Sequence, residues 1–198
     1  MIINLIKLGI KILLKTYCEK IKIKRLEIAI KNNIFKGEVE KIIIEAEKII
    51  YRGIHLNYAK INGFDLNIDF NKEIRFLKVK DFYANTILHL NKENLRNIIN
   101  NKDLTEMNNK VREFTVQNNN IEEIFFRDQL ILFNFLKDKN KYQKCFNLNI
   151  NNNNLILKDI NSKKELLIKF DTNIIFNNLK FYKNFVKVEL NSKVKIDD

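Results

Sequence analysis

The residues able to do acid–base or metal chemistry are few and scattered along this chain. Its two histidines, His55 and His89, sit among apolar neighbours in alternating segments. Neither belongs to a cluster of Cys, His or carboxylate residues of the kind that a metal site or a general base needs. The four glycines stand singly, and no Gly-x-Ser-x-Gly motif occurs. We therefore expect a protein that is not an enzyme, with no catalytic residue, no metal site, no cofactor and no small-molecule substrate.

Regularly spaced lysines near the N-terminus offer a different chemistry, which is attraction to an anionic surface. In a helix, Lys7, Lys11 and Lys15 fall on one narrow stripe, and apolar residues cover the remaining arc. Such a wide apolar arc is typical of a helix that lies in a bilayer interface with its lysines reaching phosphates. The alternative is a helix packed on its own sheet, and one side could meet the sheet while the other meets lipid. The predicted membrane contacts are Ile3, Ile6, Lys7, Ile10, Lys11, Leu14 and Lys15.

The overall charge also favours anionic partners. The chain carries 36 basic and 24 acidic residues, a net charge of +12, which suits an anionic phospholipid surface or nucleic acid. Lysines alternate with aromatic residues over 180–185, as in a platform on which bases stack. Arginine, which carries most specific nucleic-acid recognition, is sparse. Nucleic acid therefore remains an alternative partner, as does a membrane-protein complex for which the chain is a structural factor; an A/T-rich genome alone would also raise the lysine content.

The opening segment predicts neither an export signal nor a membrane span. Lys7 and Lys11 interrupt the apolar run, and no small-residue cleavage site follows it. A spanning helix needs about 20 mostly apolar residues, which this segment does not provide. We expect a chain that associates with the membrane surface without a signal peptide or a transmembrane helix.

The period of the apolar residues changes along the chain. From about residue 21 they alternate with charged residues, as in antiparallel strands with one wet and one dry face. Helical spacing returns after Asn91, a predicted helix cap, and Asp103 with Glu106 resembles a second capping box. Alternation then resumes, with turn signals at residues 151–154 and at Asn177-Asn178.

This order predicts a single α+β domain over residues 1–198. The predicted sheet is largely antiparallel and curved, wraps one or two helices and is preceded by the amphipathic helix. The predicted parts are a basic amphipathic helix at 1–20, strands at 21–90, helices at 91–117 and strands at 118–198.

The order of motifs resembles the LmeA-like phospholipid-binding family, known from actinobacteria, cyanobacteria and some plastids. Four segments carry the resemblance. A helix runs into a strand in IKILLKTYCEKIKIKRLEIAI, and two amphipathic strands flank an aromatic-Arg-Gly turn in FKGEVEKIIIEAEKIIYRGIHLNYAKINGFDLNI. A strand leads to a capped helix in ANTILHLNKENLRNII, and the closing hairpins correspond to NLILKDINSKKELLIKFDTNIIFNNLKFYKNFVKVEL.

The resemblance implies a non-enzymatic protein whose curved sheet offers an apolar groove to acyl chains. On the alternation described above, the predicted groove residues are Ile44, Leu56, Phe82 and Leu88. The family's actinobacterial members carry an export signal, whereas none is expected here. A cyanobacterial or plastid membrane-associated protein, facing the cytoplasm or the stroma, is therefore the expected form.

Overall fold

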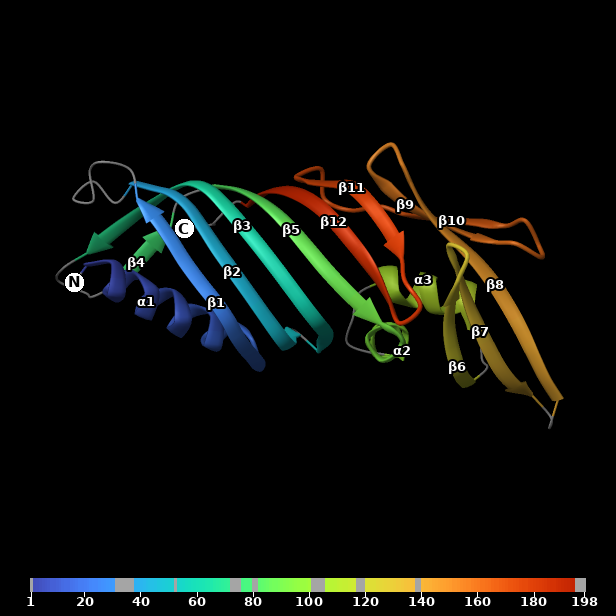
Figure 1. Cartoon of the computed structure of the whole chain (residues 1–198). Helices are drawn as coiled ribbons and strands as arrows, with labels where there is room; N and C mark the ends of the chain where they lie inside the picture. The colour runs from blue at the N-terminus through green and yellow to red at the C-terminus, as the bar shows by residue number, and fades with distance from the viewer. Residues whose placement is uncertain are drawn as a thin grey trace.

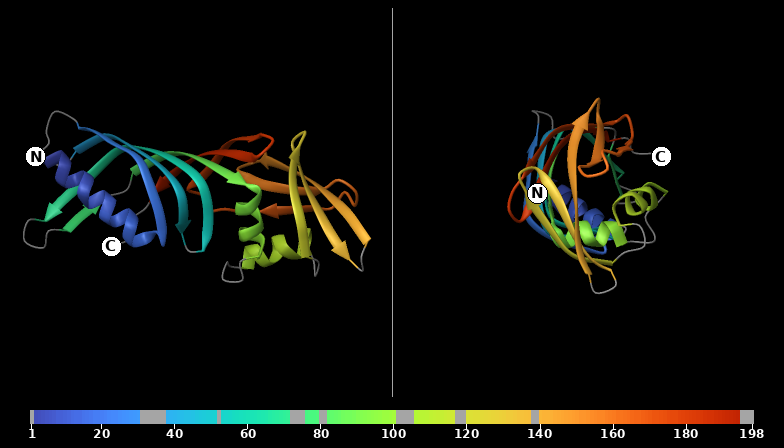
Figure 2. Two further views of the ribbon diagram at one scale, coloured as in Figure 1. Left: turned by 60° about the horizontal axis from the view of Figure 1, so that its bottom comes forward. Right: turned by 90° about the vertical axis from the view of Figure 1, so that its right-hand side faces the viewer.

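The fold is α+β and mostly antiparallel sheet, as the sequence predicts. The computed structural model describes residues 2–30, 38–51, 53–71, 76–79, 82–100, 106–116, 120–137 and 140–194. Figure 1 shows an elongated molecule in which α1 (Ile2–Tyr17) lies along one side of the first sheet. The further views in Figure 2 place α1 and the second sheet toward opposite ends of the molecule.

The first sheet has seven strands in the order β1-β2-β3-β5-β12-β11, with β4 paired to β3. Its alternating residues separate into two faces. The inner face carries small and apolar residues such as Ile42, Ala59 and Ala84, whereas the outer face carries polar residues such as Glu45 and Lys60. The strands are β1 (Lys20–Ile30), β2 (Glu38–Tyr51), β3 (Ile54–Asn71), β4 (Phe76–Val79), β5 (Phe82–Asn91), β11 (Ile174–Phe181) and β12 (Phe185–Val194).

The second sheet has five strands in sequence order, β10-β9-β8-β7-β6. Two of its hairpins turn through pairs of residues with positive φ, Asp128-Gln129 and Asn152-Asn153. Two-residue hairpin turns of this kind need positive φ at both positions, which Asn tolerates well. The turn predicted within residues 151–154 is thus confirmed. The strands are β6 (Asn120–Arg127), β7 (Leu130–Lys137), β8 (Asn140–Asn151), β9 (Asn154–Asp159) and β10 (Glu165–Ile168).

Two shorter helices, α2 (Lys92–Asn100) and α3 (Glu106–Thr115), follow β5. The predicted cap of α2 is confirmed, because the Asn94 N–H donates to Asn91 Oδ1 at 2.8 Å. The Asn91 N–H in turn donates to Asn94 Oδ1 at 3.0 Å, which completes a reciprocal capping arrangement. Asp103, the predicted cap of α3, lies outside the described residues. None of the helices in the described part of the chain has the length and apolar character needed to cross a bilayer.

The largest core lies where the two sheets, α2 and α3 meet. Fully buried Phe135 and Phe146 from the second sheet share it with Val186 of β12 and Ile99 of α2. Two smaller cores lie farther along the inner face, one of them under α1. The inner face is therefore covered by α1 at one end and by α2, α3 and the second sheet at the other.

One predicted turn is wrong. Asn177 and Asn178 lie inside β11, where pairing with β12 shifts register between Phe176 and Asn178. The chain reverses after β11 instead, where the Tyr182 N–H donates to the Phe185 carbonyl at 2.9 Å. A bulge and a turn both accommodate an unpaired residue, so the asparagines alone did not distinguish the two.

Gly63 of β3 lies at the tightest point of the inner face. A Cβ atom there would sit 2.7 Å from Ile42 Cγ2 and 3.3 Å from Leu66 Cδ1. Because both neighbours are buried, we expect Gly63→Ala to lower the free energy of unfolding by about 1–3 kcal/mol through overpacking. Urea unfolding measures this. Gly9→Ala, in half-exposed helix, is the control and should stabilise by about 0.5–1 kcal/mol; equal midpoints for Gly63→Ala and wild type would contradict the prediction.

Candidate functional site

The helix α1 has two different apolar sides. On its sheet side, Ile6 and Ile10 keep only 7% and 8% of their surface exposed. They pack with Val39, Ile42 and Leu66 of the inner face, in a cluster that half-buried Leu14 joins. Their spacing of four residues places these three side chains on one side of the helix. The helix is thus held to the sheet by its own core.

This placement corrects the set of membrane contacts predicted from the sequence. Ile6 and Ile10 are buried against the sheet, and Leu14 packs beside them, so these residues do not face outward in this structure. Ile3, near the start of the helix, is 37% exposed. The physical reason is that the sheet's inner face needs a cover, and the apolar arc of α1 supplies it.

The exposed side of α1 carries a second apolar stripe, defined by Leu5, Leu8 and Ile12. These side chains are 52%, 55% and 56% exposed. Steps of three and four residues align them on one side of the helix, away from Ile6 and Ile10. The sequence analysis did not select them, although the same spacing rule would have found a second stripe. In a helix that only packs on a sheet, polar residues would be expected on this exposed side.

The predicted lysine stripe lies on the flank between the two apolar sides. Lys11 and Lys15 are exposed, and neither forms an ion pair with the described residues. Lys7 is only half-exposed and lies near a carboxylate. The pKa of Glu27 is lowered, first by its hydrogen bond to Arg25 and to a smaller extent by the charge of Lys7. Lys11 and Lys15 are therefore the lysines whose charge is most available to an external anion.

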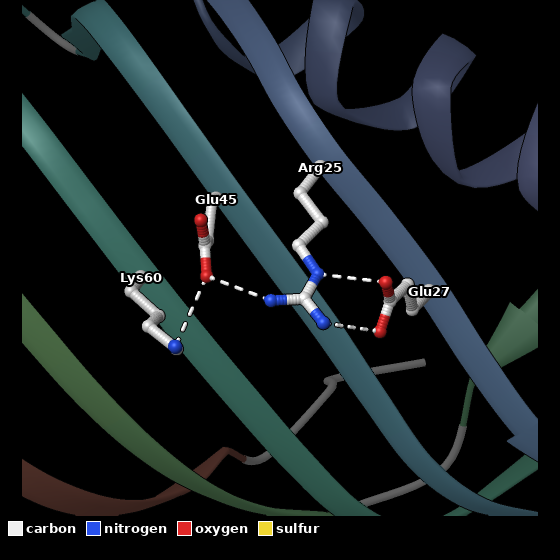
Figure 3. Close-up of polar contacts among 4 residues, drawn as sticks. All are labelled: Arg25, Glu27, Glu45 and Lys60. Carbon is white, nitrogen blue, oxygen red and sulfur yellow. Dashed lines mark hydrogen bonds and ion pairs between the residues drawn. The ribbon is translucent and has the colours of Figure 1, made fainter.

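The outer face of the first sheet is exposed to solvent, and the four charged side chains drawn in Figure 3 pair with one another. Arg25 of β1 binds Glu27 through two contacts of 2.7 Å, one from Nε and one from Nη2. Glu45 of β2 receives Arg25 Nη1 at 3.6 Å and Lys60 Nζ of β3 at 3.0 Å. The hydrogen bond to Glu27 also raises the pKa of Arg25. The positive and negative charges of these ion pairs cancel across the three strands. Arg25 and Lys60 are therefore poorly placed to attract a separate anion.

The predicted groove residues all lie on the inner face and are half-buried. Ile44 and Phe82 pack around the cluster beneath α1. Leu56 and Leu88 pack with the buried Ala46, Ile49 and Ala59 farther along the sheet. Leu88 also packs against the largest core, so the four residues are spread over three clusters, and α1 already covers part of the face that they share.

The lysine–aromatic segment at 180–185 is less open than the sequence predicts. Phe181 packs against Phe126 in the large core, with ring centroids 6.4 Å apart. Tyr182 stacks on Phe185 at 4.6 Å, Phe185 on His89 at 4.5 Å, and His89 on Tyr58 at 4.7 Å. These rings cover part of one another's faces, and Tyr182, 44% exposed, is the most open of the three aromatic residues in the segment. The segment therefore offers one accessible ring, whereas a stacking platform presents several.

Several charged residues, including Lys144, Asp159 and Lys164, line a hollow of about 640 Å³ beside α3. Burial pushes the pKa of Asp159 upward, but hydrogen bonds from Ser162 and Asn161 outweigh it and lower the pKa. Their N–H groups donate to Asp159 Oδ1 at 3.2 and 2.9 Å. A carboxylate held ionised in this way shapes its turn and is a poor proton donor. Among the described residues, no group of three or more His, Cys, Asp or Glu side chains is placed to hold a metal ion.

Comparison of the chain with protein-family models, with curated proteins and with solved structures gives no match. The likeness to the LmeA-like family therefore rests on the order of motifs and stays a prediction.

His89 in the aromatic stack makes the stability of the fold dependent on pH. Burial, and secondarily the charge of Lys187 on the neighbouring strand, lowers the pKa of His89 below its ordinary value of 6.5. Tyr58 and Phe185 cover its two sides. The unfolded chain therefore binds a proton at His89 more readily than the folded chain does. The stability that the fold gains from a neutral His89 is therefore complete above the ordinary histidine pKa. This stability is lost progressively as the pH falls below that value.

We expect His89→Phe, which keeps a ring in the stack, to remove this part of the acid sensitivity. The measurement is the free energy of urea unfolding at a series of pH values between about 8 and 5. His55→Phe, at the histidine outside the stack, is the matched control. Equal slopes of stability against pH in wild type and His89→Phe would show that His89 is not responsible.

Proposed function

We propose that this chain is a non-enzymatic, membrane-peripheral phospholipid-binding protein that meets the bilayer through the exposed side of α1. The observation that carries the proposal is the exposure of Leu5, Leu8 and Ile12 beside Lys11 and Lys15, which are exposed and form no ion pair with the described residues. A helix lying flat in the interface would bury the first three in the acyl boundary and present the two lysines to headgroup phosphates. Its sheet side would stay where it is, on the inner face.

The expected free energy of membrane binding corresponds to a reversible contact. Full burial of a Leu or Ile side chain contributes about 1.5–3 kcal/mol, so three that are half-covered already would add about 1 kcal/mol each. Each lysine near an anionic surface adds about 1 kcal/mol. The sum, about 5 kcal/mol, is comparable to the marginal binding of a single myristoyl chain. Recruitment would therefore need both parts, apolar and charged.

The second part of the proposal concerns the inner face. A sheet that curves around α1 would offer the half-buried Leu56 and Leu88 to an acyl chain next to the end of the helix. Leu56 packs among side chains no larger than isoleucine, whereas Leu88 also packs against the largest core, which contains phenylalanines. A flexible hydrocarbon chain could lie against such apolar side chains. Non-denaturing mass spectrometry of the purified chain, followed by lipid extraction, tests this part. A protein that never carries lipid would restrict the function to the surface contact of α1.

The lysines give the first vesicle prediction. Lys11→Glu with Lys15→Glu should weaken co-sedimentation with vesicles of phosphatidylcholine and phosphatidylglycerol by about thirtyfold or more, since about 2 kcal/mol of attraction is lost. Lys141→Glu with Lys163→Glu makes the same charge change away from α1 and is the control. The difference should shrink in high salt, because screening acts within about 8 Å at physiological ionic strength. Equal pelleting of both double variants would contradict the role of the α1 lysines.

The exposed apolar stripe of α1 gives the second prediction for vesicle binding. Leu8→Asn with Ile12→Asn should lower binding to the same vesicles by about thirtyfold, because it removes roughly 2 kcal/mol of interfacial burial. Leu136→Asn with Leu167→Asn, which alters two apolar residues 48% and 47% exposed in the second sheet, is the matched control. All four positions are outside the buried cores, so folding should survive. Binding that tolerates the α1 changes but not the control changes would move the contact to the second sheet.

Wild type and the variants above also test the alternative function, which is nucleic-acid binding. A nucleic-acid binder should retain single-stranded RNA with a steep dependence on salt concentration and should not pellet with vesicles. That result would replace the present proposal, since the α1 apolar stripe has no role in such binding.

A further inference from the structure

A second hollow, of about 380 Å³, opens on the outer face of the first sheet. Four strands and the loop that precedes β11 build it. Phe64 of β3 pairs with Tyr83 of β5, and in the adjoining row Asn85 pairs with Asn191 of β12. Ile175 of β11 pairs with Asn191 and forms the opposite wall. Cross-strand register thus brings together residues that are more than 100 positions apart in the chain.

The apolar part of this hollow is unusually exposed. Phe64, Tyr83 and Ile175 keep 38%, 60% and 51% of their surface accessible. They lie on the face opposite α1, where most neighbouring residues are polar. Lys41 covers part of the Phe64 ring, with Nζ 5.7 Å from the ring centroid. Tyr83 therefore presents the most accessible aromatic surface.

The polar part includes a neutral pair of amide side chains that is partly pre-arranged. Asn85 Nδ2 donates to Asn191 Oδ1 at 2.9 Å. An amide pair joined by one bond retains an acceptor oxygen on one residue and an NH₂ donor on the other. The loop that closes the hollow is fixed to β12, because the Lys193 N–H donates to the Asn173 carbonyl at 3.0 Å. Lys193 is the one charged side chain among the described residues that line the hollow.

An aromatic ring beside a neutral donor–acceptor pair matches a particular ligand chemistry. The face of an aromatic ring is electron-rich, so it attracts the C–H groups of a sugar ring. Two neighbouring sugar hydroxyls each donate and accept, which satisfies one amide oxygen and one NH₂ group together. The volume exceeds the roughly 300 Å³ at which small-molecule sites begin. The absence of any carboxylate among the described lining residues suits a ligand without cationic charge.

We propose that this hollow binds a neutral hexopyranose unit of a soluble glycan. Tyr83 stacks on the C–H face of the sugar, the Asn85–Asn191 pair binds two adjacent hydroxyls, and Ile175 closes the far side. Because the hollow and α1 lie on opposite faces of the sheet, a membrane-bound molecule would hold this site away from the bilayer. The site is independent of the phospholipid contact.

The test uses the whole chain and three soluble probes: the methyl glycosides of β-glucopyranose, β-galactopyranose and α-mannopyranose. Saturation-transfer NMR detects transfer from protein aromatic protons to sugar ring protons, and titration gives the affinity. We expect at least one probe to bind, and both Tyr83→Ala and Ile175→Asn to weaken it by about tenfold. Tyr17→Ala, at a tyrosine 69% exposed on α1, is the matched control and should bind as wild type does.

Three results would overturn the proposal. The first is that none of the three glycosides receives saturation. The second is that Tyr83→Ala and Ile175→Asn, each confirmed as folded by thermal unfolding, bind a glycoside as tightly as wild type. The third is concentration-dependent association of the chain that Tyr83→Ala abolishes without any sugar binding, which would make the same residues a protein contact.

Discussion

The burial of the first sheet's inner face is the constraint on which the rest of this structure depends. A sheet with one apolar face must cover that face, and the chain does so with different elements at its two ends. Ile6 and Ile10 of α1 cover one end, and α2, α3 and the second sheet cover the other. Everything proposed for α1 follows from this, since the helix has one side left for external contacts.

The two sides of α1 explain how a short helix could both pack on the sheet and offer the surface proposed to meet lipid. Its sheet side is stabilised by contacts with buried Val39 and Leu66. Its exposed side retains apolar surface and lies beside Lys11 and Lys15, and in the described part of the chain no residue covers that surface or forms an ion pair with these lysines. Because the two roles use different side chains, substitutions on the exposed side separate binding from folding. A helix with a single apolar stripe would not allow that separation.

The outer face of the sheet divides into parts with different chemistry. Near β1, the charges of Arg25, Glu27 and Glu45 pair across strands and cancel one another. Farther along, aromatic rings stack on His89 and cover their own faces. Around Tyr83, exposed rings of the described residues lie beside neutral amides in a hollow. The proposed sugar site is thus distinguished from its surroundings by a neutral amide pair, with Lys193 as the one charged side chain among the described lining residues, and by access to a ring.

The sequence by itself determined the local elements, because periodicity and capping are local properties. It predicted the opening helix, the strands that follow, the α2 cap at Asn91 and a largely antiparallel α+β fold, and it predicted the lysine stripe of α1. Only the tertiary structure decided which apolar side of α1 faces the sheet, since both sides satisfy helical spacing equally well. It also decided the division into two sheets, the bulge at Asn177 and the meeting of Tyr83 with Asn191, because register between distant strands depends on how the whole inner face is packed.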